Sequence, residues 1–139
     1  MVVTERLAEA ATLLLEGEAC TGLGEGAGFT QLEWVRREFL AKLGFEPYPA
    51  TFNLHMGGPD WEEAKRIMAC EPGIAITPEP GFCAAKCFLV VVAGRITGAV
   101  VFPEIGGYPP DKFEVVSAVP MRQALGVVDG DTVTISVVC

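Results

Sequence analysis

The sequence predicts one mainly β domain with short helices, arranged as a small barrel. Its 139 residues suffice for a single domain with a full core, and half of them are apolar. The second half of the chain alternates short β-branched runs with turns rich in glycine and proline, whereas only a few segments have helical periodicity. Several short strands and few helices in one domain favour a small barrel.

The first half of the chain carries most of the predicted helix. Residues 5–16 are rich in helix formers, but residues 13–21 also fit a strand, and both interpretations stay open. Thr30 predicts the start of a helix, with Glu33 closing a capping box and Gly44 ending it. The apolar stripe of this helix comprises Leu32, Val35, Phe39, Leu40 and Leu43.

A strand and a second helix follow. Residues 50–56 alternate, so they predict a strand with Phe52, Leu54 and Met56 on one face and Thr51, Asn53 and His55 on the other. The segment Asp60–Cys70 predicts a helix, with Asp60 as the cap and Glu63 completing a capping box.

The remaining residues predict the larger part of the sheet. The expected strands are Phe88–Ala93, Ile96–Phe102, Phe113–Ala118 and Thr132–Val138. Gly94 and Arg95 join the first two strands as a hairpin, and residues 103–110 form a loop. Pro120–Leu125 predicts a helical turn that ends at Gly126, and residues 129–131 predict a tight turn.

Charge and composition favour some classes of protein over others. The formal net charge is −8, so nucleic acid is not expected as a partner. The apolar runs are short, so no contact with a membrane is expected, and the N-terminus lacks the pattern of a secretory signal. The five cysteines are odd in number and form no C-x-x-C pair, which favours reduced thiols in a cytoplasmic protein.

Glycine occurs at every second position between Gly22 and Gly28. In an extended chain these positions share one side, where bare backbone lets a phosphate approach several N–H groups. The helix start predicted at Thr30 would strengthen such an anion site. The alternative is a tight turn or bulge that needs glycine only for steric reasons.

Three segments of the chain resemble the archaeal-type CTP-dependent riboflavin kinases. They are residues 17–26 (Gly-Glu, then Thr-Gly-Leu-Gly-Glu-Gly), residues 43–54 (Leu-Gly-Phe-Glu-Pro-Tyr, then Thr-x-Asn-Leu) and residues 114–131 (Glu114, Arg122 and Asp-Gly-Asp). The likeness extends over about residues 17–137 of the single domain 1–139, with residues 1–16 as an N-terminal extension.

The resemblance implies a cradle-loop β-barrel that binds CTP, Mg²⁺ and riboflavin and makes FMN and CDP. The chain is expected to be a monomer. By position it implies Thr51 and Asn53 as Mg²⁺ ligands, and Glu114 and Arg122 as catalytic residues. The nucleotide-binding residues it implies are Gly22, Leu23, Gly24, Glu25, Gly26, Ala27, Val119, Pro120, Met121 and Arg122. The flavin-binding residues it implies are Gly106 and Glu114, and Tyr108 in the same loop is a candidate for stacking on the flavin ring.

Other interpretations of the same residues stay open. This chain departs from the family pattern at four positions. Ala50 replaces a glycine, Ala27 replaces a basic residue and Gly106 replaces a threonine. Pro120 is shifted by two positions from the proline of the family. These departures favour, as an alternative, a relative that binds flavin or nucleotide without catalysis, or a kinase with a changed donor or acceptor. Small barrels also include DNA-binding proteins, which the acidic charge disfavours. The riboflavin hydroxyl would lose its proton to the phosphate or to Glu114.

Overall fold

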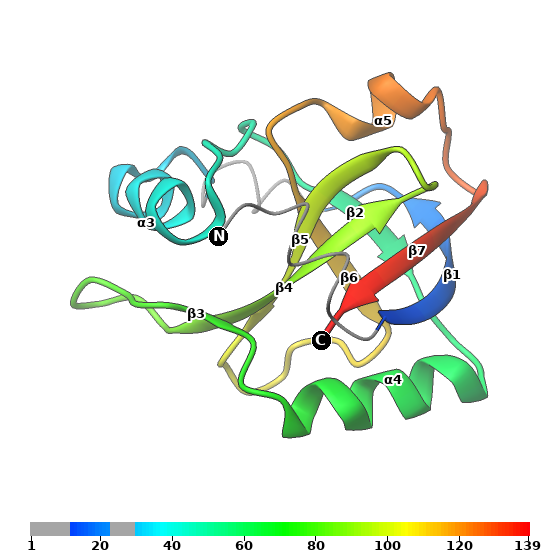
Figure 1. Ribbon diagram of the computed structural model, residues 1–139, viewed down its shortest axis with the longest axis horizontal. Coiled ribbons are helices and arrows are strands. Elements are labelled where there is room, and N and C mark those ends of the chain that lie inside the picture. Colours follow the sequence, from blue (N-terminus) through cyan, green and yellow to red (C-terminus); the bar gives the residue numbers. More distant parts are fainter. Residues whose placement is uncertain (1–11, 23–29) are drawn as a thin grey trace.

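The computed structural model describes residues 12–22 and 30–139. Within these ranges seven antiparallel strands form one sheet in the order β3-β4-β5-β6-β2-β1-β7, and a pairing between β4 and β7 closes it. The strands are β1 (Thr12–Cys20), β2 (Phe52–His55), β3 (Ile74–Ile76), β4 (Ala85–Val92), β5 (Ile96–Pro103), β6 (Lys112–Val116) and β7 (Thr132–Val138). The predicted mainly β barrel is therefore confirmed (Figure 1).

Three helices of the described residues surround the barrel. They are α3 (Glu33–Leu43), α4 (Pro59–Cys70) and α5 (Met121–Leu125). In Figure 1, α4 lies across the lower end of the barrel, α5 lies at the upper end, and α3 stands to one side. In the part of the chain that the structure describes, no helix is both long enough and apolar enough to cross a membrane.

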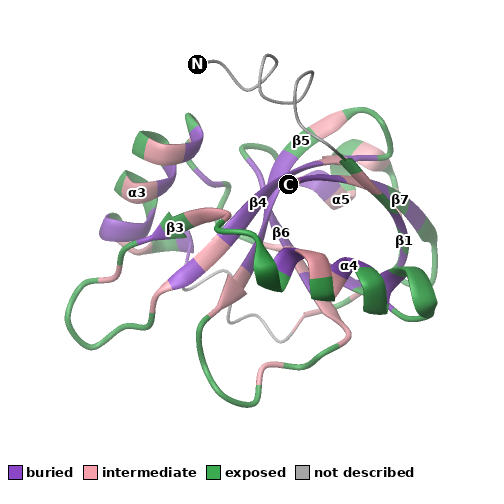
Figure 2. Ribbon diagram, turned by 60° about the horizontal axis from the view of Figure 1, so that its bottom comes forward, coloured by how far each residue is buried: buried purple, intermediate pink, exposed green. Residues whose placement is uncertain are grey.

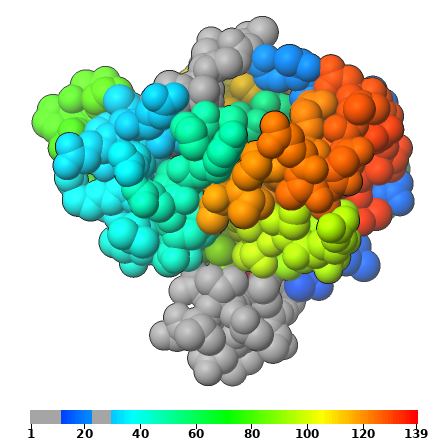
Figure 3. Space-filling model, turned by 90° about the horizontal axis from the view of Figure 1, so that it is seen from above, coloured from blue at the N-terminus to red at the C-terminus, as the bar shows by residue number. Residues whose placement is uncertain are grey.

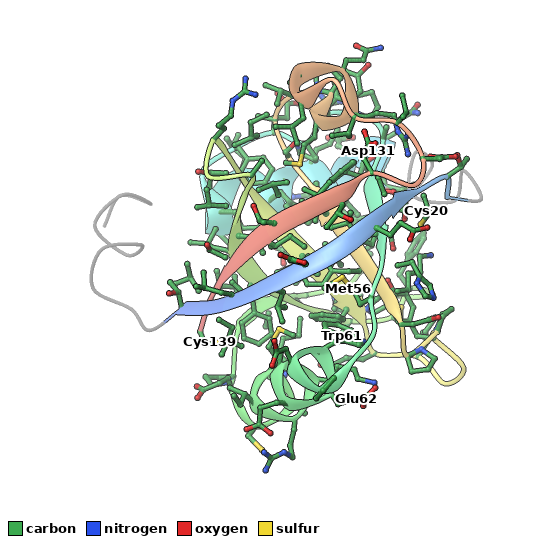
Figure 4. The ribbon with its side chains drawn as sticks, turned by 90° about the vertical axis from the view of Figure 1, so that its right-hand side faces the viewer. Cys20, Met56, Trp61, Glu62, Asp131 and Cys139 are labelled. Carbon is green, nitrogen blue, oxygen red and sulfur yellow. The ribbon has the colours of Figure 1, made fainter. Side chains whose placement is uncertain are left out.

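The barrel interior is filled by the inward-facing side of each strand. Phe52, Leu54 and Met56 are buried there, as the alternation in residues 50–56 predicts. Helix α4 closes the lower end with Trp61, Ala64 and Met68. Figure 4 shows Trp61 pointing toward the barrel below Met56, while Glu62 on the same helix points away from the barrel.

A second core lies outside the barrel, between α3 and the sheet. Trp34, Val35, Phe39 and Leu43 of α3 pack on Cys87 and Leu89, which face outward from β4. Because the inward-facing residues of β4 are also buried, this strand is covered on both sides, as Figure 2 shows. Burial on both faces explains why its sequence is continuously apolar.

The predicted helix starts are wrong in detail. Helix α3 begins at Glu33 after Leu32, which makes no side-chain capping bond, and Thr30 is itself buried in helical backbone. Helix α4 begins at Pro59 after Gly58, so Asp60 lies in the first turn instead of capping it. A proline at the first position and an acidic residue in the first turn both suit a helix start without a side-chain cap. Leu40, predicted on the apolar stripe of α3, is 56% exposed.

The helix end at Gly44 is confirmed. Gly44 has a left-handed backbone with φ of 81°, and its N–H reaches the carbonyls of Phe39 and Leu40. The predicted helical turn at residues 120–125 likewise ends at Gly126, whose φ is 67°.

For the N-terminal segment the strand interpretation is right and the helix is wrong over residues 12–16. Strand β1 pairs with β7 along Thr12–Glu18, and its burial alternates, with Leu15 and Ala19 inside the barrel. Residues 5–11 lie outside the described residues.

All five cysteines are free thiols, in agreement with the prediction of reduced cysteines. Burial raises the pKa of the Cys87 thiol to about 12, so this sulfur stays protonated at neutral pH.

Gly98 sits where β5 approaches β6 closely, so replacing it is expected to destabilise the barrel. A Cβ at this position would lie 2.7 Å from the backbone oxygen of Val116, which cannot move aside without disturbing the sheet. Gly98→Ala is expected to lower the free energy of unfolding by about 1–3 kcal/mol, measured by urea denaturation. Gly57→Ala is the matched control, because a Cβ there meets no atom within 4 Å. Equal stability of the two variants would contradict the prediction.

Candidate functional site

The predicted metal ligands and the predicted flavin carboxylate meet on the outer face of β2 and β6. Asn53 and Glu114 lie directly opposite each other in the antiparallel pairing of these strands. Thr51 Oγ1 donates a hydrogen bond to Glu114 Oε2 at 3.1 Å, and Asn53 Nδ2 donates to Thr51 Oγ1 at 3.3 Å and to its carbonyl at 3.4 Å. The three side chains therefore form one polar cluster on this face.

Asn53 has a buried side-chain oxygen that accepts no hydrogen bond from the described residues. The residue is only 7% exposed, and its Oδ1 has no hydrogen-bond partner among residues 12–22 and 30–139. Because Nδ2 donates to Thr51, Oδ1 is the atom of this amide that has no partner among the described residues. A buried acceptor without a partner costs stability, which is typical of a functional position.

Gly22 lies against Asn53, at the start of the glycine-rich segment. A Cβ on Gly22 would come within 2.4 Å of Asn53 Nδ2, so only glycine allows the backbone this close to the amide. The other predicted phosphate-cradle residues, Leu23, Gly24, Glu25, Gly26 and Ala27, lie outside the described residues. Gly22 alone thus places the beginning of that segment next to the predicted metal ligands.

The donor chemistry of this cluster fits Mg²⁺. A hard cation prefers oxygen ligands and keeps water and substrate phosphates in its shell. Asn53 Oδ1 accepts no hydrogen bond from the described residues, and Thr51 Oγ1 is a second neutral oxygen of the same cluster. In the described ranges, no group of three or more His, Cys, Asp or Glu side chains forms another candidate metal site.

Tyr108 extends the cluster toward the loop between β5 and β6. Its hydroxyl donates to Glu114 Oε1 at 3.1 Å, and Lys112 Nζ lies 3.7 Å from the same oxygen. Burial, and then the negative charge of Glu114, raise the pKa of Tyr108 well above its ordinary range, so the phenol stays protonated. Gly106, two residues earlier, is exposed, with open space where a side chain would be.

Arg122 is held by groups at the end of β1 and in the turn before β7. Its Nη2 donates to the carbonyl of Cys20 at 2.9 Å and lies 2.8 Å from Asp129 Oδ1. Asp129 also accepts a 2.6 Å hydrogen bond from Thr21 Oγ1. The guanidinium therefore anchors the chain just before Gly22, and 38% of its side chain remains accessible.

The ion pair with Arg122 gives a testable dependence on pH. The hydrogen bond from Thr21, and then the contact with Arg122, hold the pKa of Asp129 below its ordinary value. Since the folded-state pKa is depressed, the stabilisation is present above about pH 4 and is lost as the pH falls through the folded pKa. Asp129→Asn is expected to lower the urea midpoint slightly near neutral pH, and the difference should shrink in acid. A difference that grows in acid would contradict this account.

A cavity of about 250 Å³ adjoins Thr51 and the segment before α5. It is lined by the four predicted nucleotide residues Val119, Pro120, Met121 and Arg122, together with Tyr48 and Thr51. In Figure 3 the orange segment that includes α5 lies beside the teal segment that precedes β2. The side chain of Met121 is buried, whereas Val119 and Tyr48 are partly exposed at this cavity.

Tyr48 is a candidate that sequence reasoning missed, although it lies within the quoted Gly-Phe-Glu-Pro-Tyr motif. Its N–H donates to the carbonyl of Ser117 at 2.7 Å, which ties the two walls of the cavity together. The residue is 37% exposed and lines the cavity, so part of it is accessible to a ligand. Its place in this motif was the sequence feature from which Tyr48 could have been recognised as a candidate.

His55 lies outside the cluster. Its imidazole is 62% exposed and its Nε2 lies 2.8 Å from Asp111 Oδ2. This agrees with the interpretation of a solvent-exposed, hydrogen-bonded histidine on the same strand face as Asn53.

Comparison with known proteins gives a consistent result. The family model of the CTP-dependent riboflavin kinase domain, described as a domain of unknown function, DUF120, matches residues 19–137. A riboflavin kinase of Pyrobaculum arsenaticum is 40% identical over 134 residues, which cover 91% of this chain and 61% of that protein. A riboflavin kinase of Archaeoglobus fulgidus is 38% identical over 131 residues, covering 91% and 55%. One from Methanocella arvoryzae is 33% identical over 127 residues, covering 88% and 56%. The chain spans about three fifths of the length of these relatives.

Proposed function

Because this chain belongs to the CTP-dependent riboflavin kinase family, we propose that it transfers the γ-phosphoryl group of CTP to the 5′-hydroxyl of riboflavin, giving FMN and CDP. The observation that carries this proposal is the partly buried cluster of Thr51, Asn53 and Glu114 beside Gly22. It puts neutral oxygen donors, a carboxylate and close-approaching backbone at one place, as phosphoryl transfer between two small molecules requires.

Thr51 and Asn53 would hold Mg²⁺, with Asn53 Oδ1 as the oxygen that has no other partner among the described residues. When bound, the metal neutralises phosphate charge and orients the transferring group. The chain's own contribution is to fix the amide through Thr51, so that its oxygen needs no reorganisation when substrate arrives.

The nucleotide would lie between Gly22 and the cavity beside α5. The backbone at Gly22 faces the phosphates, and the cavity of about 250 Å³ lined by Tyr48 and residues 119–122 receives the remainder of CTP. Arg122 keeps part of its guanidinium accessible while Asp129 and Cys20 set its position. It would therefore stabilise phosphate charge from a fixed position.

Glu114 would bind the ribityl hydroxyls of riboflavin. In the reaction the 5′-oxygen forms a bond to the γ-phosphorus as the bond from that phosphorus to the β–γ bridging oxygen breaks, and CDP leaves. The hydroxyl proton passes to Glu114 or to the transferring phosphate. The chain would work with these small molecules as a cytoplasmic monomer, and its acidic charge gives nucleic acid no favourable surface.

The test is incubation of the protein with riboflavin, Mg²⁺ and each nucleoside triphosphate in turn, with FMN separated by chromatography. FMN formation that requires Mg²⁺ and is fastest with CTP is expected. No FMN from any nucleotide would overturn the proposal. Flavin binding without turnover would support the alternative, a non-catalytic flavin-binding relative, and turnover with another triphosphate would identify a changed donor.

A further inference from the structure

Asp129 joins three segments of the chain through its two carboxylate oxygens. Oδ2 accepts a 2.6 Å hydrogen bond from the hydroxyl of Thr21, the residue before Gly22. Oδ1 lies 2.8 Å from Nη2 of Arg122 in α5. The carboxylate therefore connects the turn before β7 both with the start of the glycine-rich segment and with α5.

The turn that carries Asp129 is fixed to the end of β1 by backbone hydrogen bonds. Gly130 N–H donates to the carbonyl of Ala19, and Ala19 N–H donates to the carbonyl of Asp131, each at 2.8 Å. Figure 4 shows Asp131 and Cys20 at the same end of the paired strands β7 and β1. The backbone at Asp129 thus keeps a fixed position relative to β1.

The two carboxylates of this turn make different contacts. Asp131 Oδ2 accepts a hydrogen bond from the N–H of Val128 at 2.9 Å, so this side chain closes the turn on itself. Both contacts of Asp129 leave the turn, and its side chain is 55% exposed. Because exposed ion pairs stabilise a fold little, stability alone does not account for the outward contacts of Asp129.

The contact with Asp129 occupies one end of the Arg122 guanidinium. Within the described residues, Nη2 makes both contacts of this group, to Asp129 and to the carbonyl of Cys20. The donors on Nε and Nη1 have no partner among these residues and suit an anion. Cys20 lies opposite Asn53 in the pairing of β1 with β2. Asp129 and Cys20 thus hold Arg122 at the strand that neighbours a proposed Mg²⁺ ligand.

We propose that Asp129 is a positioning residue for phosphoryl transfer, which fixes Arg122 and the backbone before Gly22 relative to each other. The proposal rests on the proposed kinase function and deepens it, because it makes two separate parts of the proposed nucleotide site one unit. Phosphoryl transfer depends on positioning more than on covalent chemistry. Without Asp129, Thr21 and Arg122 move independently, and the charge of the guanidinium is no longer held where the phosphates lie.

Asp129→Ala removes both contacts and is expected to lower kcat/KM for CTP by about 10–100-fold, since a misplacement of about 1 Å can cost that much. CTP affinity, measured by calorimetry, should fall as well, because Gly22 and Arg122 both face the phosphates in the proposed site. The KM for riboflavin should stay unchanged, since neither partner of Asp129 is a proposed flavin-binding residue. The urea midpoint should fall only slightly.

Two further variants separate position from charge and from stability. Asp129→Asn is expected to restore most of the activity, because the amide oxygen can accept from Arg122 while its NH₂ group donates to the hydroxyl of Thr21. Glu63→Ala is the matched control: it removes a carboxylate that is 54% exposed and paired with Arg66 on α4. This control should have the kinetics of the wild type.

A double-mutant cycle with Arg122→Met tests whether Asp129 acts through the arginine. If it does, Asp129→Ala costs much less in the Arg122→Met background than in the wild type. An equal cost in both backgrounds, or an unchanged kcat/KM for CTP in Asp129→Ala, would overturn the positioning role and leave the kinase proposal intact. If the wild type binds CTP but makes no FMN, the kinase proposal fails, and unchanged CTP affinity in Asp129→Ala then overturns the positioning role too. A wild type that binds no CTP would overturn both.

Discussion

Asn53→Ala is expected to lower kcat/KM for FMN formation by about 10²–10³-fold, the loss typical of removing one preorganised charge-stabilising group. The substitution removes Oδ1, the buried oxygen that has no partner among the described residues, and with it one of the two proposed Mg²⁺ ligands. Steady-state kinetics over a range of Mg²⁺ concentrations should show that the variant needs more metal. Little change in either quantity would contradict the metal assignment.

The same variant should not lose stability in the absence of ligands. An amide oxygen buried without a partner costs about 1–3 kcal/mol, and that cost disappears with the side chain. We therefore expect the free energy of unfolding of the free protein to stay the same or rise, while the stabilisation that Mg²⁺ and CTP give the wild type is lost. If Asn53 were needed for the fold itself, its removal would lower the free energy of unfolding of the free protein as well as the stabilisation by Mg²⁺ and CTP. Measuring the two quantities therefore distinguishes a metal-binding residue from a structural one.

His55→Ala is the control for Asn53→Ala. His55 lies on the same strand face two residues further on, but its side chain is 62% exposed and contacts Asp111, which is itself 49% exposed. Its removal is expected to leave kcat/KM within about twofold, as is usual for exposed positions away from a site. A loss as large as that of Asn53→Ala would mean that the strand, and not the amide, is responsible.

The contrast between β7 and β3 shows which parts of this barrel local sequence can predict. The predicted strand Thr132–Val138 is observed with the same bounds, because it alternates as far as Val137 and follows a tight turn. Strand β3 has only three residues and was missed. It exists because Ile74–Ile76 pair with Ala85–Cys87 of β4, a partner that no local pattern specifies. The predicted start of β4 at Phe88 was late for the same reason.

The site, too, could be predicted only as far as local sequence patterns allow. Alternation in residues 50–56 placed Thr51 and Asn53 on one face, and this face holds the polar cluster. That Glu114 lies opposite Asn53 depends on the pairing of β2 with β6, which joins segments about sixty residues apart. The cavity beside α5 depends on how this helix packs on the barrel end, so Tyr48 was not recognised from the sequence.

Arg122 and Gly22 each have a structural role in addition to the binding role that the motif predicts. Arg122 is positioned by Asp129 and by the carbonyl of Cys20, so it both anchors the end of β1 and remains partly accessible. Gly22 was expected to face phosphate, and its close approach to Asn53 gives it a steric requirement as well. The steric and the functional interpretations of this glycine are therefore compatible, because the close approach brings backbone to Asn53, one of the proposed metal ligands.

Glu114→Gln is expected to lower kcat by about 10²-fold or more, the range associated with a positioned proton-accepting group. The change keeps the shape of the side chain, and the amide can still bond Thr51 and Tyr108 after their hydroxyls reorient. What is lost is the negative charge that we propose lies beside the acceptor hydroxyl of riboflavin. CTP affinity should stay unchanged, since Glu114 lies on the side of the cluster toward Tyr108 and does not line the cavity beside α5.

Two comparison variants separate the charge of Glu114 from its hydrogen bonds. Tyr108→Phe removes one neutral donor worth about 0.5–1.5 kcal/mol, so its effect on kcat should not exceed roughly tenfold. Glu104→Gln makes the same chemical change at an exposed position in the neighbouring loop and should leave kcat unaltered. In Glu114→Gln the pKa of Tyr108 should move back toward its ordinary range without reaching it, because burial, the larger cause of its rise, remains. A tyrosine titration that does not move, or a kcat close to that of the wild type, would show that the charge of Glu114 is not used in the reaction.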